Sequence, residues 1–138
     1  MIRWSAVLLL LSATPSHAVL ECVYYDQGVA AAALVVQIET PKVSPADANG
    51  DCAVTGPAIR VFAGTLVVGD WVTALVPCDN ALGMAGQTLW TDATALATAK
   101  VVELHLDEDG AVAGYGAGIA LLDTVSQSPI WKPICGAD

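Results

Sequence analysis

Four widely spaced cysteines constrain this chain more than any other feature. They are Cys22, Cys52, Cys78 and Cys135. Their spacing fits no zinc knuckle or zinc ribbon, and there is no Cys-x-x-Cys pair of the kind that thiol–disulfide enzymes use. An even number of cysteines in an exported chain indicates structural disulfides, here two, although the sequence alone allows three connectivities.

Export is predicted by the N-terminal eighteen residues, "MIRWSAVLLLLSATPSHA". Arg3 supplies a positive start, Ala6–Ala13 is a short apolar run, and small residues precede the expected cleavage after Ala18. This is the layout of a secretory signal peptide, residues 1–18, and the run is too short to span a bilayer. A buried N-terminal element is the alternative. The mature chain would start at Val19 and be periplasmic or extracellular.

Lipid anchoring and membrane insertion are both disfavoured after cleavage. A lipobox needs a small residue before its cysteine, whereas Glu21 precedes Cys22. The longest later apolar run, "VAAAALVVQI", is short and is interrupted by Gln37. We therefore expect residues 19–138 to form one domain that does not insert into a membrane.

The acidic composition excludes several partners. The chain carries 5 Lys and Arg against 14 Asp and Glu, a net charge of −9. Loss of Arg3 with the leader leaves four basic residues against 14 acidic ones, or −10. A nucleic-acid backbone would be repelled at long range, and so would an anionic membrane surface.

Hydrophobic alternation predicts mostly strands. Alternation over 34–39 indicates a first strand, and the Pro-, Asp- and Gly-rich segment from Pro41 to Gly50 indicates a loop. Ala58–Gly64 and Trp71–Cys78 predict an antiparallel hairpin. The preceding segment "VYYDQGVAAAA" is ambiguous, since its alanines also suit a short helix.

The second half predicts one helix and another hairpin. Thr91 and Asp92 are good helix caps before "ATALATA". The stretch "KVVELHLDEDGAVAGYGAGIALL" then predicts two strands joined at Asp109-Gly110. The tail "SQSPIWKPIC" is expected to be extended and fixed at Cys135.

This order of three strands, a helix and two strands predicts a mainly β fold. We expect a five-stranded barrel like the oligonucleotide/oligosaccharide-binding (OB) fold, with one short helix between strands three and four and two disulfides. The segment "AIRVFAGTLVVGDWVTALVPC", Ala58 to Cys78, resembles secreted netrin-type and metalloprotease-inhibitor modules in its "VFxG" strand end, its turn and its following cysteine. The resemblance implies an exported OB-like barrel. It implies no inhibitor activity, because Cys22 is not at the mature start.

The hairpin also favours one disulfide connectivity. If the chain turns near Leu66–Gly69, residues before the second strand lie beside those after the third. Cys52 would then be close to Cys78, which leaves Cys22 for Cys135. The other connectivities stay open at this stage.

No residue set predicts catalysis. His105 shares a strand face with Asp107, but Ser44, Ser126 and Ser128 lie in expected loops, and we interpret the face as a solvated one. The carboxylates that follow, "DED", lie at an expected hairpin tip, where charges are usually solvated.

Two apparent ligand motifs also favour structural roles. Gly114–Gly118, "GYGAG", lacks the helix start and lysine of a phosphate loop and indicates a barrel bend. Asp47, Asn49 and Asp51 imitate the start of a calcium loop, but its glycine and final glutamate positions hold cysteine and alanine. We therefore predict no metal, no cofactor and a polar loop that leads to a disulfide cysteine.

Aromatic residues remain as the candidate ligand contacts. Trp71, Trp90 and Tyr115 could stack on a ligand, and packing at the barrel ends is the alternative. We predict a small exported binding or structural module without catalysis, with a protein, peptide or glycan as partner. A secreted protein-binding inhibitor is the alternative, and a hydrolase is a distant third.

Overall fold

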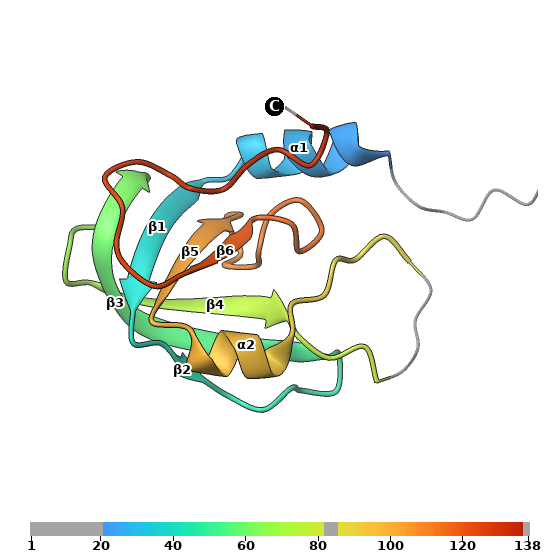
Figure 1. Ribbon diagram of the computed structural model, residues 1–138, viewed down its shortest axis with the longest axis horizontal. Coiled ribbons are helices and arrows are strands. Elements are labelled where there is room, and N and C mark those ends of the chain that lie inside the picture. The colour runs from blue at the N-terminus through green and yellow to red at the C-terminus, as the bar shows by residue number, and fades with distance from the viewer. Residues whose placement is uncertain (1–20, 82–85, 137–138) are drawn as a thin grey trace, which may run out of the picture.

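The computed structural model describes residues 21–81 and 86–136. The predicted signal peptide, residues 1–18, and the predicted mature start at Val19 lie outside the described residues. In chain order the elements are α1 (Cys22–Ala30), β1 (Leu34–Glu39), β2 (Lys42–Val43), β3 (Asp51–Ala63), β4 (Trp71–Pro77), α2 (Ala93–Thr98), β5 (Val101–Leu106) and β6 (Ile119–Leu122) (Figure 1).

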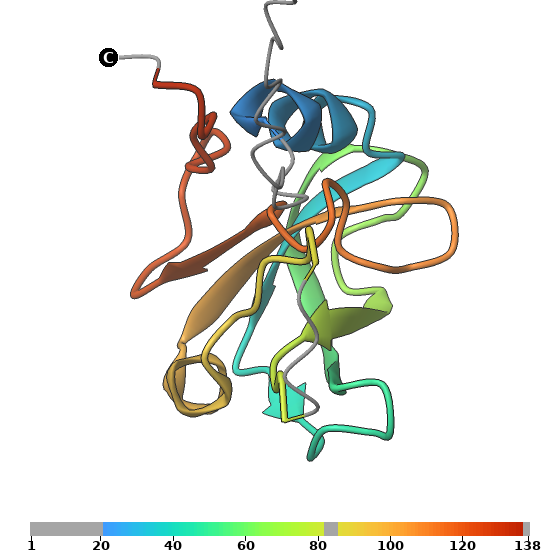
Figure 2. The same cartoon turned by 90° about the vertical axis from the view of Figure 1, so that its right-hand side faces the viewer.

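The strands form one curled antiparallel sheet, a half-barrel. Its order is β2-β3-β1-β5-β6, and β4 pairs with β3. The long strand β3 pairs with β1 through its second half and with β4 through its first half. Figure 2 shows the sheet curling between α1 at one end and α2 at the other. The predicted mainly β fold is thereby confirmed, including a short helix between the third and fourth predicted strands, but the sheet has six strands rather than the predicted five, because β2 is added.

The core lies inside the curl of this sheet. Alternate residues of β1, β3, β4 and β5 point inward and are almost fully buried, as hydrophobic alternation requires. Leu96 of α2 is fully buried against them and covers one end of the core. The Asp92 side chain accepts a hydrogen bond from the Thr94 amide at 3.4 Å, so the predicted helix cap is confirmed.

Both disulfides have the favoured connectivity. Cys52–Cys78 joins β3 to the segment after β4 and is buried in the core. Cys22–Cys135 joins the start of α1 to the chain's last described turn, and Cys135 is exposed. One bridge therefore fastens the core, and the other fastens the C-terminal segment to α1.

Three boundaries differ from expectation. The ambiguous N-terminal segment forms α1, which ends at Ala30, within the alanine run. A two-residue strand, β2, lies in the predicted loop and pairs with β3. β3 begins at Asp51 rather than Ala58, because pairing with β4 outweighs the loop signal of Gly56 and Pro57.

The second predicted hairpin is less regular than expected. Between β5 and β6 the chain makes turns, and only isolated bridges join Ala111 to Leu75 and Val112 to Leu106. These bridges bring the segment beside β4 and partly close the seam of the half-barrel. Among the described residues, no helix has the length and apolar character needed to cross a membrane.

Candidate functional site

The β3–β4 turn presents apolar side chains to solvent. Val67 and Val68 are 67% and 64% exposed, and Trp71 at the start of β4 is 64% exposed. The turn is well defined: the Asp70 carboxylate accepts a hydrogen bond from the Val67 amide at 2.9 Å, and Gly69 has a φ of +99°. Three adjacent exposed apolar side chains on an ordered turn form a candidate contact surface. We call Val67, Val68 and Trp71 the hairpin tip.

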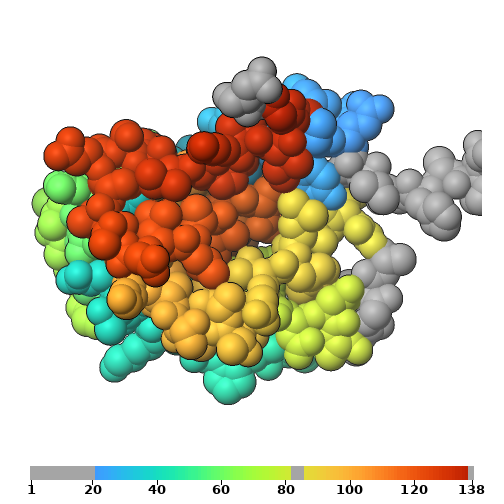
Figure 3. All heavy atoms as spheres, viewed as in Figure 1, coloured from blue at the N-terminus to red at the C-terminus, as the bar shows by residue number. Residues whose placement is uncertain are grey.

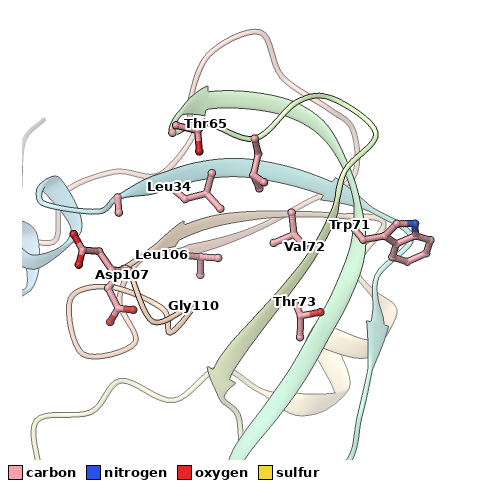
Figure 4. Close-up of a pocket in the computed structure, with 12 residues that line it drawn as sticks. Leu34, Thr65, Trp71, Val72, Thr73, Leu106, Asp107 and Gly110 are labelled. Carbon is pink, nitrogen blue, oxygen red and sulfur yellow. The ribbon is translucent and has the colours of Figure 1, made fainter.

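A pocket of about 320 Å³ opens beside the hairpin tip. In Figure 4, Leu34, Val72 and Leu106 point towards one another across it, and Trp71 and Asp107 lie at opposite ends. The lining residues come from β1, β4, β5 and the turns next to them; they are Ala33, Leu34, Gly64, Thr65, Leu66, Trp71, Val72, Thr73, Leu106, Asp107, Glu108 and Gly110. This set combines an apolar floor, two hydroxyls and two carboxylates with no basic side chain.

The outer face of β4 extends the surface of the hairpin tip and carries no charged side chain. Trp71, Thr73 and Leu75 are all exposed and alternate with buried residues. Across the strand pair, Thr73 lies opposite Thr55, and their hydroxyl oxygens are 3.3 Å apart. In a chain of strongly negative charge, a neutral face of this kind favours contact with another molecule.

The other two candidate aromatics lie at the far end of β4. The half-buried Trp90 ring packs on Gly50, where an added Cβ would be 2.8 Å from the ring. Tyr115 packs edge-to-face on Tyr25, with ring centroids 6.1 Å apart. The Leu89 amide donates to the Tyr115 carbonyl, which brings this second group together.

The three candidate aromatics therefore do not form one stacking platform. Trp71 begins β4, whereas Leu89 and Gly116 meet near Pro77 at its end. The length of the strand separates the two ends by about 20 Å. Trp71 is the candidate that lines the pocket.

The polar face of β5 is buried, so the interpretation of His105 as solvated is wrong. His105 is 6% exposed, and Glu103 and its strand partner Gln37 are fully buried. The C-terminal segment, residues 125–135, crosses the sheet here (Figures 1 and 3). We call this segment the C-terminal strap, and Gln37, Glu103 and His105 the polar cluster.

Glu103 binds the strap through both carboxylate oxygens. Its Oε1 accepts hydrogen bonds from Gln37 Nε2 and the Ile130 amide, each 2.8 Å. Its Oε2 accepts from the Trp131 amide at 2.8 Å and lies 3.0 Å from His105 Nε2. The carboxylate is thus fully partnered by the fold.

Further side chains extend this attachment along the strap. Gln37 bonds both the amide and the hydroxyl of Ser126. Trp131 packs against His105, with ring centroids 5.6 Å apart, and its indole N–H donates to the Ala117 carbonyl. Nearer the disulfide, Asp26 of α1 accepts the amides of Ile134 and Cys135.

Hydrogen bonding determines the ionisation of Glu103. Burial alone would raise the pKa of this carboxyl. The hydrogen bonds from His105, the Ile130 amide, Gln37 and the Trp131 amide together outweigh burial and lower the pKa below 4.5. The polar cluster therefore holds a charged carboxylate whose task is to bind the strap, and the strap separates it from solvent.

The acidic loops also have structural roles. Asp47 Oδ1 accepts the amides of Asn49 and Asp51 at 2.8 and 3.0 Å, which closes the turn before β3. Burial, with Asp47 nearby, raises the pKa of Asp51. Asp107 Oδ1 closes a similar turn by accepting the Asp109 and Ala111 amides. Within residues 21–81 and 86–136, no group of three His, Cys, Asp or Glu residues could hold a metal ion.

The "GYGAG" segment packs closely on α1. Gly114 has a φ of +66°, and an added Cβ would lie 2.6 Å from both the Tyr25 carbonyl oxygen and a Val29 methyl group. Gly116, at φ +92°, passes even closer to the Leu89 carbonyl. These glycines permit close approach of two backbones.

Sequence reasoning named Trp71 but missed the rest of this region. Leu34, Val72 and Leu106 lie in predicted strands, but the sequence did not indicate that they line a pocket at the end where the core opens. The two adjacent valines in a polar turn, "TLVVGD", were the available signal for the hairpin tip.

No family model, curated protein or solved structure matches this chain. The resemblance to netrin-type and metalloprotease-inhibitor modules stays a prediction.

Proposed function

We propose that this protein is a small exported binding module that recognises another protein or peptide, without catalysis. The observation that carries the proposal is the hairpin tip: Val67, Val68 and Trp71 are each more than three-fifths exposed and lie beside a pocket with an apolar floor. Isolated exposed apolar residues are common, but a clustered set next to a pocket is typical of contact surfaces. The predicted signal peptide, residues 1–18, and the two disulfides support export to the periplasm or outside the cell.

A protein partner is favoured over a glycan. Sugar recognition commonly uses aromatic faces set side by side, and Trp90 and Tyr115 lie at the opposite end of β4 from Trp71. Adjacent valines offer branched apolar surface with no hydrogen-bonding group, which suits a protein side chain better than a sugar hydroxyl.

The buried polar cluster supports the absence of catalysis. His105 Nε2 and Glu103 Oε2 lie 3.0 Å apart, and both side chains are buried beneath the strap. Each Glu103 oxygen accepts two hydrogen bonds from the protein itself. A general base must reach a substrate proton, and this carboxylate has no free direction from which to do so.

The proposal can be tested by site-specific photo-crosslinking in cells that export the oxidised protein. Val68→benzoylphenylalanine should give a discrete crosslinked partner. The same photoreactive residue at Ala97, exposed on α2 at the other end of the half-barrel, is the matched control. Excess wild-type protein should compete, and a Val68→Ser/Trp71→Ala double variant should not. Identical products at both positions, or equal competition by the variant, would overturn the proposal.

A further inference from the structure

The hydrogen-bond pattern of β4 leaves one of its edges open. At one end of the β3–β4 ladder the Cys78 amide donates to the Gly50 carbonyl at 2.9 Å, and at the other the Ala58 amide donates to the Asp70 carbonyl at 2.8 Å. The register between these ends is unbroken. In an antiparallel pair every second residue exchanges bonds with its neighbour, so the bonded residues of β4 are the even-numbered ones. The backbone groups of 71, 73 and 75 therefore point away from β3.

On this outward side, Leu75 is the one of the three residues whose backbone groups form hydrogen bonds. The Leu75 amide donates to the Gly110 carbonyl at 3.0 Å, and the Leu75 carbonyl accepts from the Val112 amide at 3.2 Å. Before Gly110 the chain turns back into β5. In the described part of the chain, no backbone group bonds the outward amide or carbonyl of Trp71 or Thr73. These groups border the pocket, so the seam of the half-barrel has a short stretch of unpaired strand edge.

The pocket beside this edge has a definite chemistry. Leu34, Leu66, Val72 and Leu106 give an apolar floor, and its volume of about 320 Å³ suits a side chain or two. Asp107 lies at the end opposite Trp71 (Figure 4), and Glu108, the next residue in the chain, also lines the pocket. Asp107 uses Oδ1 for its own turn, and its Oδ2 accepts no hydrogen bond from the residues that the structure describes, so the carboxylate can still attract a cation.

We propose that an extended, basic peptide segment of the partner adds as a strand to the edge of β4 at Trp71–Thr73. An apolar side chain of that segment enters the pocket, and a neighbouring lysine or arginine lies beside Asp107 and Glu108. The unpaired main-chain groups supply the pairing, the pocket selects the side chain, and the acidic end selects the charge. This inference rests on the proposed binding function and specifies its ligand.

Synthetic peptides test the ligand chemistry directly. The probe is a short fluorescein-labelled peptide in which valine alternates with lysine, titrated with the oxidised protein by fluorescence anisotropy. A matched peptide with glutamate in place of lysine should bind at least about tenfold more weakly, because it meets carboxylates. A third peptide, N-methylated on alternate backbone amides, should bind about fivefold more weakly, because it loses main-chain donors.

Variants of the protein test the position. Thr73→Pro removes an outward amide that β3 does not use, and Thr73→Val, which keeps the amide, is its control. Asp107→Asn/Glu108→Gln keeps the turn acceptor and removes both charges. Glu39→Gln/Asp123→Asn removes two exposed charges elsewhere. The proline variant should lose about fivefold in affinity for the lysine peptide, and the first charge variant about tenfold, with both controls unchanged.

The outcomes separate this inference from the proposed function. Equal binding of the lysine and glutamate peptides, or full affinity in both Thr73→Pro and the N-methylated peptide, would overturn strand addition at β4. If Thr73→Pro does not fold, the N-methylated peptide alone decides. A third outcome is that no peptide binds, while wild-type protein still competes for the Val68 crosslink and the Val68→Ser/Trp71→Ala variant does not. The proposed binding function would then be supported, and the inference that the ligand is a basic strand would be wrong.

Discussion

The outer face of the half-barrel has two regions that the chain treats in opposite ways. Over the middle of β1 and β5 the outward residues Gln37, Glu103 and His105 are polar and buried, and the C-terminal strap covers them and donates backbone hydrogen bonds to Gln37 and Glu103. Over β4 the outward residues are neutral or apolar, and they stay exposed beside an unpaired edge. Polar residues are therefore the buried ones and apolar residues the exposed ones, the reverse of the usual expectation.

The difference shows on which surface the chain supplies all the hydrogen-bond partners from its own residues. A buried carboxylate is stable only when its hydrogen bonds are provided, and the strap provides backbone amides that are fixed in place by a disulfide. Over the described ranges of the chain, no backbone group bonds the outward amide or carbonyl of Trp71 or Thr73. The covered region therefore contributes to the stability of the fold, and the uncovered region is the surface available to a partner.

Loss of the disulfides should have the largest effect on the covered region. Loop closure contributes roughly 3.5 kcal/mol for the Cys52–Cys78 bridge and roughly 5 kcal/mol for Cys22–Cys135, as upper estimates. Reduction of both should unfold the domain, observed as loss of the thermal transition in circular dichroism. An unchanged melting temperature in thiol reductant would contradict this.

A variant that removes only one bridge sharpens the comparison. Cys22→Ser/Cys135→Ser should release the end of the strap while the buried Cys52–Cys78 bridge holds the core. Amide hydrogen exchange should then rise over residues 125–135 more than in β3 and β4. Uniform exchange across the chain would show that the strap is not a separate unit.

Glu103→Gln should have the next largest effect, a loss of about 3 kcal/mol in the free energy of unfolding. The new amide group would face donors, since both carboxylate oxygens accept from N–H groups. Glu39→Gln, at the exposed end of β1, is the matched control and should change stability little. Urea denaturation measures both, and equal effects would contradict the role of the strap.

Acid should weaken the same region by a smaller amount. The pKa of Glu103 is lowered on folding, so its contribution to stability is complete above the ordinary value of 4.5 and is lost as pH falls through the lower folded value. Melting temperatures measured from neutral pH to below pH 4.5 should fall less steeply in Glu103→Gln than in wild type. Parallel curves would exclude Glu103 as the acid-sensitive group.

The smallest effect on stability is expected in the uncovered region. Trp71→Ala should change the free energy of unfolding by less than about 0.5 kcal/mol, because its ring is mostly exposed. Trp131→Ala, under the strap, should cost about 3 kcal/mol. Only the Trp71 variant should lose the Val68 crosslink while keeping the wild-type melting curve. A large loss of stability in Trp71→Ala would assign this tryptophan to the fold.

Much of the fold could be predicted, and the reasons are local. Alternation located β1, β4 and β5, Asp92 located α2, and the hairpin geometry favoured the Cys52–Cys78 pair. β2 and the first half of β3 could not be predicted, because partners far along the chain stabilise them against their own loop composition. Within the candidate site, the sequence indicated Trp71. The pocket and the open edge of β4 could not be predicted, because they depend on how far the segment from Gly110 onward stays hydrogen-bonded to β4.

The sequence by itself determined a mainly β chain with two disulfides, because these follow from side-chain period and cysteine count. The tertiary structure alone decided which polar residues are solvated. Alternation placed Glu103 and His105 opposite the apolar residues of β5, but it could not say whether water or the strap would lie over them. That choice depends on a segment more than twenty residues further along the chain, whose amides reach Glu103 only when the whole domain has folded.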